Sequence, residues 1–154
     1  MFRNALKVLI LANVAVVFSG LGSHPAAQTP AAAQRPVATS HVPAEFYARA
    51  PNIIRKVLDS QEVGGHVLTM SDITMPVGGR EGRHKHAGIM IGLVEQGVLS
   101  MDHEPTGVRE YKAGETFYIP EGQIHEGFNK GTVPTKVIGS FVIKKGEAIA
   151  TPVP

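Results

Sequence analysis

The chain of 154 residues contains no cysteine, and this absence narrows its chemistry. It excludes disulfide bonds, a lipid-modified N-terminal cysteine and thiolate metal ligands. A metal site in this protein would therefore depend mainly on its 7 histidines.

Long apolar runs and clusters of basic residues are also scarce. After the N-terminal region no apolar run is long enough to span a bilayer, which excludes a polytopic membrane protein. Residues 1–40 contain three basic residues and no acidic one, so the remainder, with 12 basic and 13 acidic residues, has a net charge of −1. The isoelectric point near 9.0 thus reflects the N-terminal segment, and nucleic-acid binding is not expected. With 43% apolar residues, the chain is expected to fold as one domain.

The N-terminus has the pattern of a secretory signal peptide. Arg3 and Lys7 precede an apolar stretch that is followed by small residues. This pattern predicts a signal peptide over residues 1–22, cleaved after Gly22 or after Ala33, and a periplasmic protein of a bacterium. An uncleaved N-terminal anchor is the alternative.

A linker and a β-rich body are expected after the leader. Residues 23–43 are rich in Ala and Pro without a periodic apolar face, which predicts an extended linker before a domain over 44–154. In that domain, glycine-containing turns alternate with short apolar and β-branched runs, a pattern typical of all-β sandwiches and barrels. Only Ala44–Ala50 has helical potential. The expected strands are Ile53–Leu58, His66–Met75, Ile89–Val94, Val98–His103, Arg109–Tyr111, Thr116–Ile119 and Lys136–Ile143.

Two short segments contain histidines suited to metal binding. His84 and His86 are separated by one residue, so on a strand both side chains point to the same side and can chelate one ion. Two exposed histidines near a turn would show the same spacing. In the second segment a strand runs into a Pro-x-Gly turn that places His125 at the start of the next strand. Alone, His125 would be interpreted as a hydrogen-bonded structural histidine.

Together the two segments resemble the signature motifs of the cupin superfamily. The first motif joins a glycine, a His-x-His pair and a second glycine, and the second joins a glycine, a Pro-x-Gly turn, a histidine and an asparagine. The matching residues are Gly78, His84, His86 and Gly97 in the first motif, and Gly114, Pro120, Gly122, His125 and Asn129 in the second. The resemblance covers about residues 53–145. It implies a double-stranded β-helix (a jelly-roll barrel) with a metal bound inside by the motif histidines.

One position departs from the family pattern. Met90 stands where cupins usually carry a metal-binding glutamate. It has the strand parity of His84 and His86, so we expect it to point inward with Gly88 and Gly92. The implied ligand set is then three neutral imidazoles without a carboxylate. Met90 would be apolar filling of the barrel interior or, as the alternative, a thioether ligand to Cu(I).

This ligand set limits the metal. Imidazole suits Fe, Zn, Ni and Cu, whereas the missing carboxylate disfavours Mn and, more strongly, Mg and Ca. Three-histidine iron is similar to the sites of thiol dioxygenases and diketone-cleaving cupins, both of which use O2. We therefore expect one divalent transition metal, Fe(II), with Zn, Ni and Cu as alternatives, and open positions for water, O2 or an anionic ligand.

Aromatic, histidine and charged residues near the motifs give weaker signals. Phe117 and Tyr118 point to opposite faces of a strand, so one of the two can line the pocket. We expect the pocket to be lined by Tyr118 together with Met90, Gly88 and Gly92. Two further histidines, His66 and His103, are expected at a sheet edge or on the surface. Arg80 and Arg83 are expected to be solvated turn residues that could steer an anion. Three glutamates lie near the motifs, but no spacing identifies a general base among Glu81, Glu121 and Glu126. The sequence thus identifies no catalytic residue.

Three functions are compatible with these features. The first is an O2-dependent, dioxygenase-like oxidoreductase acting on a small organic molecule. The second is a non-catalytic cupin that binds a metal or a small ligand as a sensor or carrier, and the third is a metal-assisted isomerase or lyase. Fold alone does not separate them, because one fold supports many chemistries. We favour the oxidoreductase.

A homodimer is expected from the apolar residues on the opposite strand face. Ile89, Ile91 and Leu93 point away from the metal ligands and need cover. The N-terminal strand Ile53–Leu58 or a partner subunit could provide it. The resemblance favours the partner, since similar cupins commonly form dimers. No nucleic acid and, after leader removal, no membrane span is expected.

Overall fold

A computed structural model describes residues 48–154, and residues 1–47 lie outside the described part. The predicted signal peptide, the linker and most of the helical turn expected over 44–50 fall outside it. Within residues 48–154 no helix is long and apolar enough to cross a membrane. This part of the chain contains ten strands: β1 (Ile54–Val63), β2 (His66–Met75), β3 (His84–Lys85), β4 (Gly88–Gln96), β5 (Val98–His103), β6 (Gly107–Lys112), β7 (Thr116–Ile119), β8 (His125–Phe128), β9 (Thr135–Lys144) and β10 (Thr151–Pro152).

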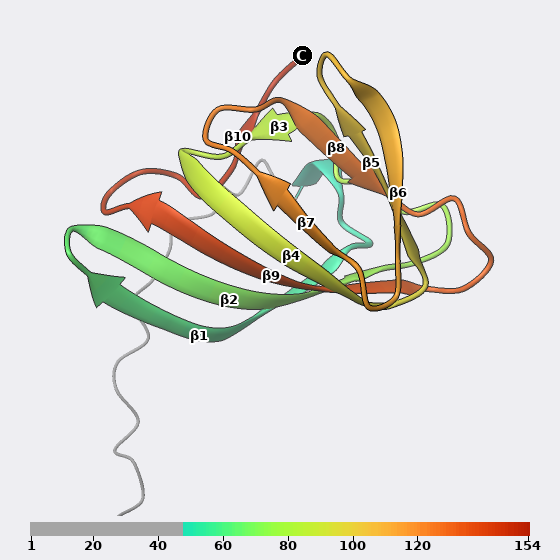
Figure 1. The fold of residues 1–154 in the computed structure, drawn as a ribbon, viewed down its shortest axis with the longest axis horizontal. Coiled ribbons are helices and arrows are strands. Elements are labelled where there is room, and N and C mark those ends of the chain that lie inside the picture. Colours follow the sequence, from blue (N-terminus) through green and yellow to red (C-terminus); the bar gives the residue numbers. More distant parts are fainter. Residues whose placement is uncertain (1–47) are drawn as a thin grey trace, which may run out of the picture. The chain divides into compact units, whose positions relative to one another are not determined.

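The strands form two five-stranded antiparallel sheets (Figure 1). The first has the order β1-β2-β9-β4-β7, and the second has the order β10-β3-β8-β5-β6. The chain passes repeatedly from one sheet to the other, for example from β4 to β5 and from β7 to β8. This arrangement is the jelly-roll barrel that the sequence predicts, and the all-β fold class is confirmed.

Strand positions follow the hydrophobic pattern closely. Three of the expected strands, β2, β5 and β7, have the predicted bounds, and β4, β6 and β9 extend beyond theirs by one or two residues at each end. The strand β1 begins one residue later than predicted and continues to Val63. The strands β3, β8 and β10 are not visible as apolar runs because they have two to four residues each and contain mostly polar side chains. Two of these short strands contain metal-ligand candidates, so the local signal was weakest at the site itself.

The core lies between the two sheets and is built by strand alternation. In β9, every second residue from Thr135 to Ile143 is buried, and the residues between are partly exposed. Both sheets contribute side chains to one buried cluster, which includes Met90, Val94, Ile119 and Phe141 from the first sheet and Leu99, Met101 and Tyr111 from the second. The barrel interior is therefore filled mainly by apolar side chains, and the polar groups within it stand out.

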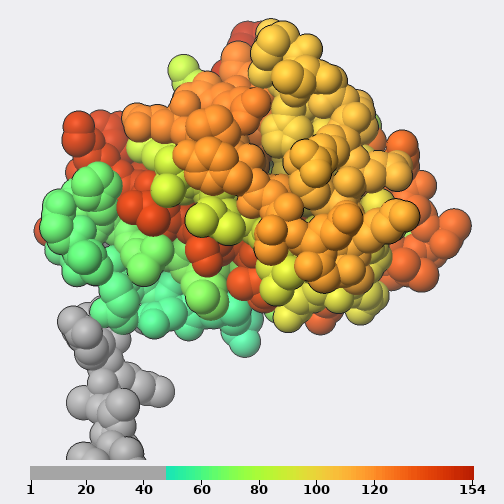
Figure 2. All heavy atoms as spheres, in the orientation of Figure 1, coloured from blue at the N-terminus to red at the C-terminus, as the bar shows by residue number. Residues whose placement is uncertain are grey.

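The outer face of the first sheet has exposed apolar side chains. Ile91 on β4 is 53% exposed, and Leu93 and Tyr118 beside it are exposed as well. The expectation that the N-terminal strand covers this face is wrong, because β1 pairs with β2 at the sheet edge and is separated from β4 by β2 and β9. Atoms of β4, β7 and β9 accordingly contribute to the surface in the space-filling view (Figure 2). Cover by a partner subunit stays a prediction.

Candidate metal centre

Three histidines from the two motifs come together inside the barrel. His84 on β3 and His125 on β8 are paired across the second sheet, and His86 directly follows β3. The ring centroid of His84 lies 4.2 Å from that of His125 and 5.0 Å from that of His86. The ring centroids of His86 and His125 are 4.9 Å apart. All three side chains are buried, and their ligand atoms lie within 4.8 Å of one another. The sequence-predicted ligands thus form one cluster.

A backbone carbonyl fixes the orientation of each of the three rings. The Nδ1–H of His84 donates to Gly82 O at 2.8 Å, and that of His125 donates to Gln123 O at 2.9 Å. The Nδ1–H of His86 donates to Ile149 O at 2.6 Å. Because a carbonyl oxygen only accepts, each Nδ1 must bear the hydrogen, and Nε2 is therefore the unprotonated nitrogen of each ring, the form that binds metals.

The C-terminal segment completes this arrangement. Ile149, whose carbonyl orients His86, precedes β10, and β10 pairs with β3 through Thr151 and Pro152. The ring of His86 also contacts Phe141 edge-on, with centroids 5.2 Å apart. No sequence signal pointed to a role for Ile149, because it contributes a backbone atom that any residue would supply.

Burial keeps the histidines neutral. It lowers the pKa of His84 to about 3, and the proximity of His125 adds to the effect. Burial likewise lowers the pKa of His86 to about 3, assisted by the other two histidines. The pKa of His125 is also lowered by burial. Neutral imidazoles are the form that binds metals, so protons compete little with a metal at neutral pH.

One buried atom in the cluster lacks a partner that a metal would supply. Nε2 of His86 is buried and, among the described residues, has no hydrogen-bond partner. Leaving a buried polar group unsatisfied costs about 1–3 kcal/mol, so such atoms are rare in folded proteins. A transition metal bound by the three Nε2 atoms would satisfy it, and the donor set of neutral nitrogens fits such an ion.

The space beside the histidines is small and mostly apolar. Its wall includes His125, the thioethers of Met75, Met90 and Met101, and the ring of Phe117. The centre of a water-sized molecule can occupy about 10 Å³ of it. This is room for about one water molecule or a ligand of similar size. Met90 therefore points inward as expected, and it does so among other sulfur-containing side chains.

Inward-facing glycines make room for large side chains in this wall. A Cβ at Gly92 would lie 2.1 Å from Cζ of Phe117, and one at Gly139 would lie 2.6 Å from Cε of Met90. Gly88 is buried as well, and there a Cβ would lie 2.1 Å from the carbonyl oxygen of Val142. The missing side chain of Gly92 thus leaves room for the Phe117 ring, whereas at Gly88 it allows close approach of the β9 backbone.

Tyr118 does not line the cavity, which corrects the expectation for this residue. Its side chain is 54% exposed on the outer face of the first sheet, whereas Phe117 is buried and lies in the cavity wall. Alternation along β7 allows either Phe117 or Tyr118 to point inward. The inward residue is Phe117, whose ring has no polar group.

The remaining motif residues have structural roles. Gly78, Gly97, Gly114 and Gly122 all have positive φ angles, which L-residues with side chains rarely adopt. At Gly97 a Cβ would also lie 2.8 Å from Pro134 O. Asn129 is buried, its Nδ2 donates to Met75 O and Val133 O, and its Oδ1 accepts from Gly131 N. Asn129 directly follows β8, and its side chain thereby ties the end of β2 to the loop before β9. The turn Pro120-Glu121-Gly122 lies before β8 in the chain.

His103 was misplaced by the sequence reasoning, which expected it at an edge or on the surface. It is buried on β5, where it pairs with His125 of β8, and its Nε2 lies 3.3 Å from the hydroxyl of Tyr111. Burial lowers its pKa. The signal that could have found it is its parity with Leu99 and Met101 on one strand. His66 is exposed, as expected.

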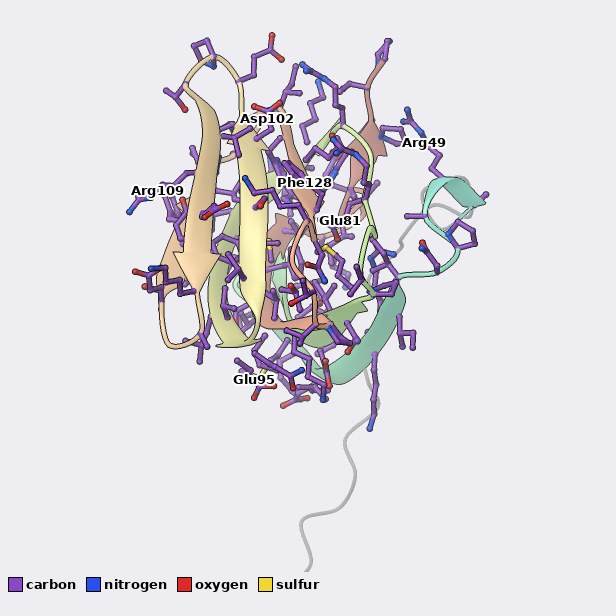
Figure 3. All side chains as sticks on the ribbon, turned by 90° about the vertical axis from the view of Figure 1, so that its right-hand side faces the viewer. Arg49, Glu81, Glu95, Asp102, Arg109 and Phe128 are labelled. Atoms are coloured by element: carbon purple, nitrogen blue, oxygen red, sulfur yellow. The ribbon has the colours of Figure 1, made fainter. Side chains whose placement is uncertain are left out.

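Among the charged candidates the two arginines are exposed, whereas the side chains of Glu126 and Glu81 are largely buried. Arg80 pairs with Glu126 and stacks 4.4 Å above the Phe128 ring, and Arg83 pairs with Glu104. Both arginines are largely solvated, as predicted. Glu121 is exposed, whereas Glu81 lies in the cavity wall. In Figure 3, Glu81 lies among the interior side chains, while Arg49, Glu95 and Arg109 lie at the periphery.

A jelly-roll barrel with three converging, neutral histidines defines a class of metal-binding β-barrel proteins. Comparison with known proteins agrees: the family model of the cupin domain matches residues 71–144. The chain belongs to the cupin superfamily.

Other known proteins are similar to this chain in sequence or in fold. An uncharacterised protein of Methanocaldococcus jannaschii is 32% identical over 96 residues, which cover 60% of this chain and 74% of that protein. A cupin-like protein from Thermotoga maritima matches with a TM-score of 0.56 at 20% identity, over 66% of this chain and 75% of that one. The DMSP lyase DddQ from Ruegeria pomeroyi also gives a TM-score of 0.56, at 19% identity, over 74% of this chain and 56% of that one. At these identities the two structures show the fold alone.

Proposed function

We propose that this cupin is a mononuclear metalloenzyme, a dioxygenase-like oxidoreductase with Fe(II) held by His84, His86 and His125. The observation that supports it most is the convergence of three buried histidine side chains, each oriented by an Nδ1–H bond to a backbone carbonyl. Bound there, iron would supply Lewis acidity and electrons for O2 chemistry. The leader pattern of residues 1–22 supports work in the periplasm.

The protein's own groups limit what reaches the metal site. With about 10 Å³ available beside His125, a ligand the size of water or O2 fits in the cavity. Its wall is mainly apolar, which suits O2, and the thioether side chains of Met75, Met90 and Met101 are flexible enough to yield to a larger molecule. A small organic substrate would therefore displace methionine side chains when it approaches the metal.

The test is O2 consumption by metal-loaded protein. Full-length protein would be stripped with a chelator, loaded anaerobically with Fe(II), Zn(II) or Cu(I), and supplied with diketones, thiols and phenols. We expect O2 uptake by the Fe(II)-loaded protein and none by the Zn(II)- or Cu(I)-loaded protein. The uptake should be lost in His86→Ala and retained in His66→Ala, which changes an exposed histidine and serves as the control. Equal uptake by wild type and His86→Ala would contradict the proposal.

A second candidate is a copper-binding carrier or sensor, and the three thioethers of the cavity favour it. Soft sulfur ligands select Cu(I), and Met75, Met90 and Met101 lie in the same wall as His125. Met90→Leu keeps the volume but removes the sulfur. Copper binding that weakens in Met90→Leu, with Fe(II) binding unchanged, would favour the carrier over the oxygenase.

A further inference from the structure

A carboxylate enters the cavity from a loop that the family motif does not use. Glu81 lies between β2 and β3, its side chain is 11% exposed, and it lines the cavity together with His125 and Met90. Its backbone N–H donates to Gly127 O at 2.9 Å, which fastens this loop to β8. Spacing alone did not distinguish Glu81 from Glu121 and Glu126.

The position of the carboxylate depends on Gly127. Residues 125 and 127 have the same parity on β8, so a side chain at 127 would point to the same side as His125. A Cβ at Gly127 would lie 2.7 Å from Oε2 of Glu81. The Glu81 carboxylate thus occupies the space that a side chain at Gly127 would fill. This position is two residues along β8 from the metal-ligand candidate His125.

Arg55 fixes the other oxygen of this carboxylate. Its Nη2 donates to Oε1 of Glu81 at 3.0 Å, and the Arg55 side chain is 9% exposed. An ion pair with so little water around it is sensitive to the loss of either partner, because the remaining charge would be buried alone. Arg55, which belongs to the edge strand β1, therefore acts as a positioning residue for Glu81.

The charge of Glu81 also acts on the histidines. Because the carboxylate lines the same cavity as His125, its negative charge produces a field that favours positive charge at the metal-ligand candidates. Met90 cannot supply such a field, although it stands at the position of the usual family glutamate. A negative group is thus present in the cavity, but it approaches from the loop before β3.

We propose that Glu81, oriented by Arg55, is the acid–base group of the metal centre, with Oε2 accepting a hydrogen bond or a proton from the small ligand held beside His125. This role rests on the metal site of the proposed function. It also places a negative charge in the cavity beside His125, so it predicts a change in metal affinity that does not depend on turnover.

The test is titration of the chelator-stripped full chain with Co(II), followed by its visible absorption, and then of the Co(II) form with azide. Glu81→Gln is expected to raise the Kd for Co(II) about 10- to 100-fold, as changes around metal ligands typically do. It is also expected to lower the Kd for azide, because the like charge that repels the anion is gone. Glu126→Gln is the matched control, since the Glu126 carboxylate pairs with the largely exposed Arg80. It should change neither constant.

The outcomes separate the two proposals. Wild type that takes up no Co(II), or His86→Ala that binds it equally well, overturns the metal centre and the role of Glu81 with it. Normal Co(II) and azide binding by a folded Glu81→Gln variant overturns only the role of Glu81. If Glu81→Gln does not fold, the double variant Arg55→Gln/Glu81→Gln removes both charges of the pair and is subject to the same expectation.

Discussion

His84 and His125 are direct partners across the β3–β8 pair, with ring centroids 4.2 Å apart. The two motifs are distant in sequence, and this single register position brings them together. Because strand register fixes which side chains lie opposite each other, the pairing of β3 with β8 places two of the three ligand candidates side by side.

Metal binding should stabilise the fold. A ligand that binds only the native state at 100 times its Kd adds about 2.7 kcal/mol to the free energy of unfolding. We expect Zn(II) or Co(II) to raise the thermal midpoint of chelator-stripped protein, and EDTA to reverse the rise. His86→Ala should show no such shift, and an equal shift in this variant would show that the metal binds elsewhere.

Stability without metal should fall as the pH falls below 6.5. The folded pKa of His84 and His86 is about 3, below the ordinary value of 6.5, so at pH 5 to 6 the unfolded chain binds protons that the folded chain does not. Their contribution is present above pH 6.5 and is lost towards pH 3. Each such proton corresponds to a slope of about 1.4 kcal/mol per pH unit.

Urea unfolding of stripped protein between pH 6 and 5 measures this slope. Removing one buried histidine, as in His84→Gln, should decrease the slope by about one proton's contribution. An unchanged slope would mean that His84 is protonated in the folded protein.

Gly92 should be required for the packing of Phe117. Because a Cβ would lie 2.1 Å from the ring, Gly92→Ala is expected to destabilise the protein by about 1–3 kcal/mol, as overpacking does. In a Phe117→Leu background the same change should cost much less. Urea unfolding of the four proteins gives the coupling, and equal costs in both backgrounds would contradict the contact.

A second copy of the chain is our expected cover for the exposed face of the first sheet. Ile91→Glu or Leu93→Glu should convert a dimer to a monomer in light scattering coupled to gel filtration, since a charge would be buried at the interface. Val108→Glu, at an exposed site on β6 of the other sheet, is the control and should not change the mass. A monomeric wild type would contradict the expectation.

The sequence predicted the framework better than the interior. Strand alternation and the glycine turns gave the all-β class and the inward parity of Met90, and the two motifs gave the three histidines. The sequence could not assign Phe117 and Tyr118 to their faces, nor could it place Glu81 or the carbonyl of Ile149 at the site. These positions depend on how the loops and the C-terminal segment pack on the barrel, and a pattern along one strand contains no information about that packing.

The three-histidine metal centre is tested most simply by the metal content of protein purified without added metal, measured for wild type, His86→Ala and His66→Ala. We expect about one iron per chain in wild type and His66→Ala, and none in His86→Ala. A folded wild type without any transition metal even after loading, or equal metal content in His86→Ala, would contradict it.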